Sequence, residues 1–298
     1  MTGERRSRIV DEIQAAARVT DGMAIVIGGH IMSSHPMAVI RQIIKQGTKN
    51  LTVIGAASAG LEVDLLVGAG CARRVITPYV GGEALAPIGP FYQAAVQRGE
   101  IEVWECDEGI YYTALRAAAL KLPFLPTLSG LGTSLPDVNP DLRLFNDPIT
   151  GRPLVAVPPL QPDVALIHAA VADAYGNVQF VGSGMGDRAH HRAAVTTIVT
   201  VERVVPNEEI RKNPLATAVW NVEAVVRAPY GSHPYQSPGF YLHDEDHLNE
   251  YLRAARAAVQ GDRRPFAEYL DRYILGPANH AEYLQTVGFP RILSLHEV

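Results

Sequence analysis

The sequence predicts an α/β fold in which an open, mostly parallel sheet carries helices on both sides and a helical extension follows. Continuous apolar runs of strand length, such as residues 23–27, indicate strands covered on both faces. A small-residue loop and then a stretch with helical spacing follow most of these runs, which is typical of parallel α/β sheets. Beyond residue 243 the strand pattern stops and helical spacing continues.

The first half of the chain repeats a strand–loop–helix unit. It opens with an amphipathic helix predicted over residues 7–18, in which Ile9 and Ile13 share one face. Pro36 suits the first turn of the helix that follows the first strand. We predict strands over residues 23–27, 51–55, 74–76 and 101–105, and helices over residues 37–46, 62–69, 90–98 and 111–120.

The second half predicts further strands and then helices only. The strands are expected over residues 154–157, 164–169, 178–180, 197–201 and 222–226, and the helices over residues 248–259, 265–274 and 280–287. Aromatic residues recur at helical spacing in the tail, so we expect it to pack on the sheet domain. The predicted domains are residues 1–242, the α/β domain, and residues 243–298, the helical extension.

Composition excludes several classes of function. The chain of 298 residues has a net charge of −5 and no basic run, so nucleic-acid binding is not expected. No stretch reaches the roughly 20 apolar residues of a membrane span, and no signal-peptide core is present, so a cytoplasmic protein is expected. Cys71 and Cys106 form no disulfide framework, and His190-His191 has no further ligand at metal spacing, so no metal and no permanently bound cofactor are expected.

The loop after the first strand is the first candidate site. Gly28 and Gly29 allow backbone N–H groups to approach a ligand, Ser33 and Ser34 add hydroxyls, and a helix begins just after them. A glycine-rich turn that merely needs a positive φ remains the alternative. The loop contains no dinucleotide fingerprint, phosphate loop or hydrolase nucleophile elbow.

Residues 21–36 read DGMAIVIGGHIMSSHP, which closely resembles the signature of the A (or α) chain of family I CoA transferases. That signature runs Asp-Gly, two residues, three apolar residues, Gly-Gly-Phe, three residues, Gly, one residue and Pro. His30 replaces the usual Phe and Ser34 the usual Gly. Further segments resemble the family, namely 79–83, 99–103, 122–126, 173–178 and 197–202. Segments 155–158, 208–211 and 228–234 are similar to the glutaconate CoA-transferase branch.

The resemblance implies a CoA-transferase-like fold and a half-site. In this family the thioester is attacked by a glutamate that lies within Glu-Asn-Gly or Glu-x-Gly of the B subunit, and neither motif occurs in this chain. We therefore expect the partner to be a B subunit, in an αβ or (αβ)₂ assembly, and coenzyme A to be a substrate. The substrate-binding residues implied are Gly28, Gly29, His30, Ser33, Ser34, Ser58, Ser129, Gly130 and Gly132. Residues 230–234 either pack against the partner or shape the acyl pocket.

An acidic segment leaves a second reading open. Residues 104–109 read WECDEG, which resembles the α subunit of a steroid ring-opening hydrolase of the same fold. Glu105 would then be the catalytic base of a CoA-dependent hydrolase. That hydrolase has an arginine in the region that Leu128 or Ser129 occupies here. The alternative is that the acidic residues only form a turn, whose negative charge stabilises the N-terminus of the next helix. Cys106 is expected to pack, since nearby carboxylates disfavour its thiolate. A catalytically silent ligand-binding or sensor protein is the third reading.

Overall fold

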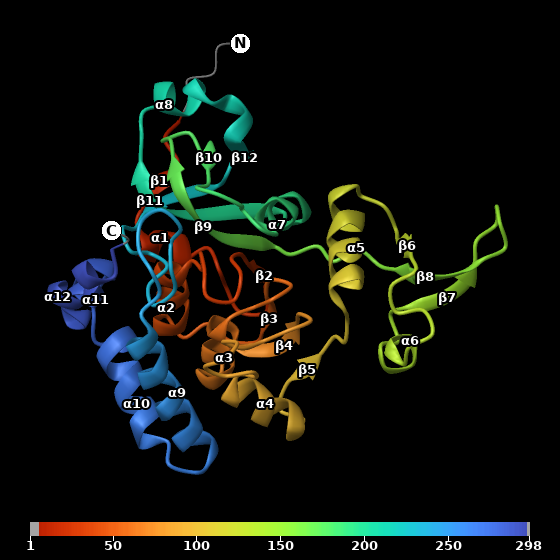
Figure 1. The fold of residues 1–298 in the computed structure, drawn as a ribbon, viewed down its shortest axis with the longest axis horizontal. Helices are drawn as coiled ribbons and strands as arrows, with labels where there is room; N and C mark the ends of the chain where they lie inside the picture. The colour runs from red at the N-terminus through yellow and green to blue at the C-terminus, as the bar shows by residue number, and fades with distance from the viewer. Residues whose placement is uncertain (1–5, 297–298) are drawn as a thin grey trace.

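The computed structural model describes residues 6–296 and is built around one ten-stranded sheet (Figure 1). Its main path is β1-β13-β11-β9-β2-β3-β4-β5, with every neighbouring pair parallel, while β10 and β12 pair antiparallel at the end of β9. The strands are β1 (Ile9–Val10), β2 (Ala24–Ile27), β3 (Leu51–Ile54), β4 (Ala72–Ile76), β5 (Glu102–Val103), β9 (Val164–Ala172), β10 (Val178–Gln179), β11 (Thr196–Val204), β12 (Thr217–Val219) and β13 (Ala224–Arg227). The expected open, mostly parallel sheet is confirmed.

Alternate side chains of the strands enter two separate cores, which is why the strands read as continuous apolar runs. In β2, Ile25 and Ile27 join the core beneath one set of helices, and Val26 joins the opposite core. The first set is α1 (Glu12–Ala16), α2 (Met37–Lys45), α3 (Leu61–Gly68) and α4 (Pro90–Gln97). The opposite core is covered by α5 (Glu108–Ala119) and α7 (Asp187–Ala193).

Strands β2 and β9 are neighbours at the centre of the sheet. From β2 the chain moves outward to β5, and from β9 it moves the other way to β13. The order therefore reverses between β2 and β9. Ligands of open α/β sheets bind beyond the carboxyl ends of the strands at such a point. The loop after Ile27 is therefore the first candidate for a ligand site.

The N-terminal helix predicted over residues 7–18 is wrong at its start. Ile9–Val10 is instead a short strand, β1, paired in parallel with β13. Asp11 ends the strand and caps the helix, because its side chain accepts a hydrogen bond from the Gln14 backbone N–H at 2.6 Å. Helix α1 therefore covers only Glu12–Ala16.

A three-stranded antiparallel sheet, absent from the sequence prediction, lies beyond α5 on the right of Figure 1. It consists of β6 (Leu125–Thr127), β8 (Pro153–Val157) and β7 (Arg143–Asn146), with α6 (Leu135–Val138) between β6 and β7. The strand expected over residues 154–157 belongs to this small sheet. Several of its large apolar side chains are exposed, among them Leu128, Leu144 and Ile149.

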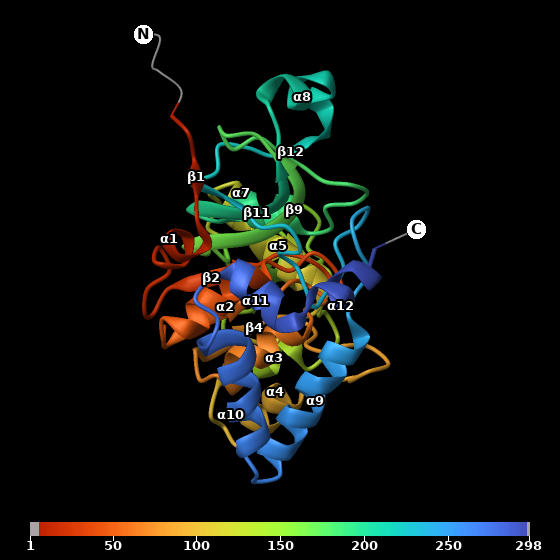
Figure 2. The same cartoon turned by 90° about the vertical axis from the view of Figure 1, so that its left-hand side faces the viewer.

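The remaining helices are mostly C-terminal and pack on the α2–α4 side (Figure 2). They are α9 (Glu245–Val259), α10 (Arg264–Leu270), the π-helical turn η2 (Asp271–Leu275), α11 (His280–Val287) and α12 (Phe289–Ser294), while α8 (Asn207–Lys212) and η1 (Pro214–Ala216) lie between β11 and β12. Phe91 of α4 and Phe266 of α10 have ring centroids 4.5 Å apart. No helix in residues 6–296 is both long and apolar enough to cross a membrane.

One buried hydrogen bond joins the C-terminal helices to α3. The Tyr251 hydroxyl donates to the Asp64 carboxylate at 2.6 Å, and both side chains are buried. Burial raises the pKa of Asp64 to about 6, so at pH 8 the carboxylate is charged and depends on its donors. The bond therefore anchors α9 to the sheet domain.

Tyr251→Phe is expected to lower the free energy of unfolding by about 2 kcal/mol at pH 8, because it leaves a buried carboxylate short of a donor. Tyr273→Phe is the matched control, since its hydroxyl bonds Glu250 at a partly exposed position, and it should cost under about 1 kcal/mol. Urea denaturation measures both. Equal losses in the two variants would contradict the anchoring role of Asp64.

Candidate functional site

The turn after β2 is shaped by a carboxylate at the start of helix α7. Gly29 has φ +101° and its N–H donates to Asp187 Oδ1 at 3.0 Å. A Cβ at Gly28 would lie 2.4 Å from the same oxygen, so no side chain fits there. Glycine is therefore required at 28 by close approach and favoured at 29 by backbone conformation.

Most backbone N–H groups of this loop donate to acceptors within the chain. Gly28 donates to Leu166 O at 2.8 Å, and Gly29 donates to Asp187. The N–H groups of His30, Ile31, Ser33 and Ser34 donate to the carbonyls of Ser33, Ser58, His30 and Gln236. The Gly28 and Gly29 N–H groups are therefore engaged within the chain, and a contact of these residues with a substrate stays a prediction. The Ser33 and Ser34 hydroxyls lie 3.1 Å apart in the same loop.

A buried polar chain fixes the end of β3 to the same turn. The Tyr111 hydroxyl lies 2.6 Å from Gly55 O, to which it donates, and 2.9 Å from His190 Nε2. The other ring nitrogen of His190 lies 3.3 Å from Asp187 Oδ1. Burial raises the pKa of Tyr111 well above its usual value, so its hydroxyl stays protonated. Asp187 and Tyr111 were not predicted from the sequence.

Two further loops that contain predicted substrate-binding residues contact the beginning of α5. Ser58, in the loop after β3, donates to Glu108 Oε1 at 3.1 Å and its carbonyl accepts from Ile31 N–H. Ser129 donates to Asp107, whose carboxylate also caps α5 through Ile110 N–H. The loops after β2, β3 and β6 are thus joined in one continuous surface around the N-terminus of α5.

The predicted glycines of the third loop differ in setting. Gly130 is buried, with φ +79°, and a Cβ there would lie 3.0 Å from Ile110 Cδ1. Gly132 has φ +76° but is exposed, with open space around it. Only Ser129 and Gly130 are therefore held against α5.

The acidic segment does not form the crowded carboxylate cluster that a base would need. Asp107 and Glu108 bond Ser129 and Ser58, whereas the Glu105 side chain is exposed and its carbonyl accepts from Asn139. Burial together with Asp107 and Glu105 raises the pKa of the Cys106 thiol to about 12. Cys106 is therefore a protonated packing residue, as predicted.

Segment 228–241 flanks the β2 loop. Gln236 N–H donates to Met32 O, Gln236 O accepts from Ser34 N–H, and Ser232 Oγ accepts from His35 N–H at 2.9 Å. Residues 230–234, whose role the sequence left open, thus support the loop from the side of the C-terminal helices.

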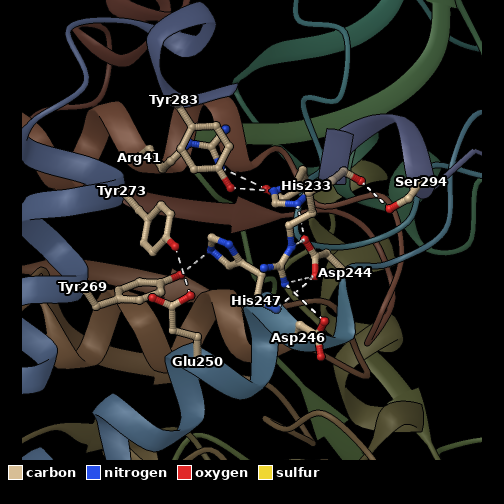
Figure 3. Close-up of polar contacts among 11 residues, drawn as sticks. Arg41, His233, Asp244, Asp246, His247, Glu250, Tyr269, Tyr273, Tyr283 and Ser294 are labelled. Carbon is tan, nitrogen blue, oxygen red and sulfur yellow. Dashed lines mark hydrogen bonds and ion pairs between the residues drawn. The ribbon is translucent and has the colours of Figure 1, made fainter. Parts of the chain in front are cut away.

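One side-chain group in residues 6–296 has the spacing of metal ligands, and it lies among the C-terminal helices. His233, Asp244 and His247 point toward one another, with ligand atoms within 4.8 Å (Figure 3). Asp244 already accepts from Arg291 and lies 3.0 Å from His233 Nε2, and the Arg41 guanidinium donates to His233 O. Two guanidinium groups oppose a further cation, so we interpret the cluster as an anchor for α2. His190 and His191 contact different partners, Tyr111 and Thr197.

The family model described as Coenzyme A transferase matches residues 10–228. The chain belongs to the coenzyme A transferase family. This CoA transferase chain is 31% identical to the A chain of glutaconate CoA-transferase from Acidaminococcus fermentans, over 95% of this chain and 92% of that one. It is 34% identical to the cholesterol ring-cleaving hydrolase IpdA subunit of Mycobacterium tuberculosis, over 82% of this chain and 87% of that subunit. It is 37% identical to an uncharacterized protein of Archaeoglobus fulgidus and spans 60% of that protein's length.

Two solved structures share the CoA transferase fold closely. Glutaconate CoA-transferase from Acidaminococcus fermentans superposes with a TM-score of 0.92 at 30% identity, covering 98% of this chain and 96% of that one. The AibA/AibB decarboxylase, in a cysteine-to-serine variant, gives a TM-score of 0.77 at 30% identity, covering 90% and 98%. The predicted CoA-transferase-like fold is confirmed.

Gly60→Ala tests how tightly the β2 and β3 loops are packed in this CoA transferase chain. The new Cβ would lie 2.3 Å from Ile31 O, so the loop must shift, and the free energy of unfolding should fall by about 2 kcal/mol. Gly82→Ala is the control, because the nearest atoms to its Cβ belong to the side chains of Leu61, at 3.2 Å, and Leu85, at 3.8 Å. Denaturant titration compares them. A Gly60→Ala protein as stable as Gly82→Ala would show that the loops are not closely packed.

Proposed function

We propose that this chain is the A component of a two-subunit CoA transferase that exchanges CoA between an acyl-CoA and a short carboxylic acid of the glutaconate type. The glutaconate CoA-transferase relative aligns over nearly its whole length, which supports this substrate class. Two relatives are named as A subunits, so the partner proposed is a B subunit.

The observation that carries the proposal is a loop surface without a free nucleophile. Among the described residues, the carboxylates that reach the joined loops are Asp107, Glu108 and Asp187, which accept hydrogen bonds from this chain, and Glu62, which is fully buried and accepts from the Gly60 N–H. An acyl-transfer nucleophile has to be unengaged and directed at the thioester carbonyl. We assign that role to a glutamate of the B subunit.

The proposed reaction proceeds through two covalent intermediates. The B-subunit carboxylate attacks the acyl-CoA carbonyl and the C–S bond breaks, giving an acyl-glutamyl anhydride and CoA thiolate. The thiolate then attacks the glutamyl carbonyl of the anhydride, so the acyl group leaves as a carboxylate and a glutamyl-CoA thioester remains. The acceptor carboxylate reverses these steps, and no proton or electron is gained or lost overall.

The residues proposed to hold the substrate are those of the joined loops. Ser33 and Ser34 offer hydroxyls to a substrate carboxylate or acyl oxygen, and His30 lies in the same loop. Ser58, Ser129 and Gly130 shape the neighbouring surface, with Gly132 on its exposed side. The role proposed for Gly28 and Gly29 is to set the loop conformation.

The hydrolase alternative is not favoured. It requires Glu105 as a base, yet the Glu105 side chain is exposed and bonds none of the described loops. The arginine of the ring-opening enzyme is also absent, with Leu128 and Ser129 in its place. Some relatives are named as hydrolase subunits, but they belong to the same family as the transferase relatives. Similarity to them therefore does not favour hydrolysis over transfer.

Borohydride trapping tests the transferase proposal directly. The chain is purified together with its B subunit, incubated with glutaryl-CoA and then reduced with borohydride. The expected result is loss of activity that requires prior acyl-CoA, with a reduced glutamate found by mass spectrometry in the B subunit, because a glutamyl thioester is reducible.

Glu105→Gln separates the two readings. The variant enzyme should keep its transferase rate within about twofold, since Glu105 takes no part in the transfer. Loss of all turnover in this variant, with no covalent adduct in the unsubstituted enzyme, would establish the hydrolase instead. Full activity of the isolated chain without a B subunit would also overturn the proposal.

A further inference from the structure

His35 lies directly behind the β2 loop and touches two of its carbonyl groups. Its side chain is fully buried. The Nδ1 atom lies 2.9 Å from Gly28 O, and the Nε2 atom lies 3.1 Å from Ile31 O. The ring therefore spans the two ends of the turn that Gly28 opens.

Two carbonyl contacts impose a protonation state on the ring. A carbonyl oxygen only accepts hydrogen bonds, and a neutral imidazole carries one N–H. In the neutral form one bare nitrogen would face a carbonyl oxygen at 3.1 Å or less, with lone pairs opposed. Only the imidazolium form donates to both Gly28 and Ile31.

Glu62 supplies the opposite charge. Its Oε1 atom lies 3.4 Å from His35 Nδ1 and accepts from Gly60 N–H at 3.0 Å. The Tyr235 hydroxyl also acts on this carboxyl group and lowers its pKa, because a hydrogen bond from the hydroxyl favours the charged form of Glu62. The proton shared by the pair is therefore better placed on His35.

Burial opposes an isolated charge on either group. It lowers the pKa of His35 to about 4 and raises the pKa of Glu62 to about 8. Moving the shared proton from Glu62 to His35 keeps the net charge of the pair at zero but creates two buried charges, and the contacts of His35 with two carbonyls and of Glu62 with the Gly60 N–H offset that cost. The other titratable groups that face His35 are Asp187 from α7, His30 from the loop and Tyr235 from segment 228–241.

We propose that His35 is a positioning residue: a doubly donating imidazolium, balanced by the Glu62 carboxylate, that holds the loop from Gly28 to Ser34 in its binding conformation. The loop needs such support, because Ile31 and Ser34 adopt left-handed φ values of +43° and +62°. The effect on catalysis rests on the proposed function, whereas the protonation state does not.

The proposal sets a direction for pH dependence. On the alkaline side the imidazolium loses its extra proton, because that form alone carries an N–H on each ring nitrogen. One carbonyl then loses its donor and the loop is released. The KM for the carboxylate substrate should therefore rise on the alkaline side, while kcat changes less.

Nitrogen NMR of the ¹⁵N-histidine-labelled chain, assembled with its B subunit, tests the protonation state. His35→Gln identifies the His35 signals by their loss. At pH 7 both ring nitrogens are expected to carry protons, and one of these protons is expected to be lost as the pH rises. A single N–H with one unprotonated nitrogen at pH 7 would overturn the proposal.

Glu62→Gln removes the counter-charge while keeping an acceptor for Gly60 N–H. His35 should then be neutral at pH 7, and kcat/KM should fall about tenfold, with the alkaline limb displaced to lower pH. Asp64→Asn is the matched control, because it neutralises a second buried carboxylate of the same helix, and both ring nitrogens of His35 should stay protonated at pH 7 in that variant. An unchanged His35 state in Glu62→Gln would refute the pairing. Two protonated nitrogens in an assembly without transferase activity would refute the proposed function alone.

Discussion

The contact between Asp187 and the Gly28–Gly29 turn is the constraint on which the rest of the candidate site depends. It joins residues 158 positions apart and brings α7 against the end of β2. The carboxylate also receives His190, and through it Tyr111 and the end of β3. Because the Asp187 carboxylate lies so close to Gly28 and Gly29, the turn has little conformational freedom. The loops that are hydrogen-bonded to the turn are therefore held in fixed positions.

A rigid loop surface explains how one fold serves several reactions. Relatives of this chain are named as transferase, hydrolase and decarboxylase components at similar identity. Most backbone donors of the β2 loop are satisfied within the chain, so this polypeptide contributes mainly shape and hydroxyl groups. Chemistry that differs among relatives then has to come from variable side chains or from another polypeptide.

The sequence predicted what depends on local pattern and missed what depends on distant partners. Most strands of the main sheet, although not β1 or β12, and the helices α2 to α5 follow from apolar periodicity, and the glycine loops follow from their place after strands. The small sheet of β6, β7 and β8 was missed, because its strands are short and half-exposed. Asp187 and the His35–Glu62 pair carry no local signal, since each acts through contacts across the fold. The start of α1 was misjudged because Ile9 and Ile13 fit a helix as well as a strand followed by a cap.

The exposed apolar side chains around the small sheet affect how the newly made chain behaves before it is assembled. Leu128, Leu144 and Ile149 face solvent on an element that stands apart from the main sheet (Figure 1). Edge strands with such side chains invite self-association and attack by proteases. A cell that makes this polypeptide therefore gains from keeping its concentration low or its residence in the free state brief.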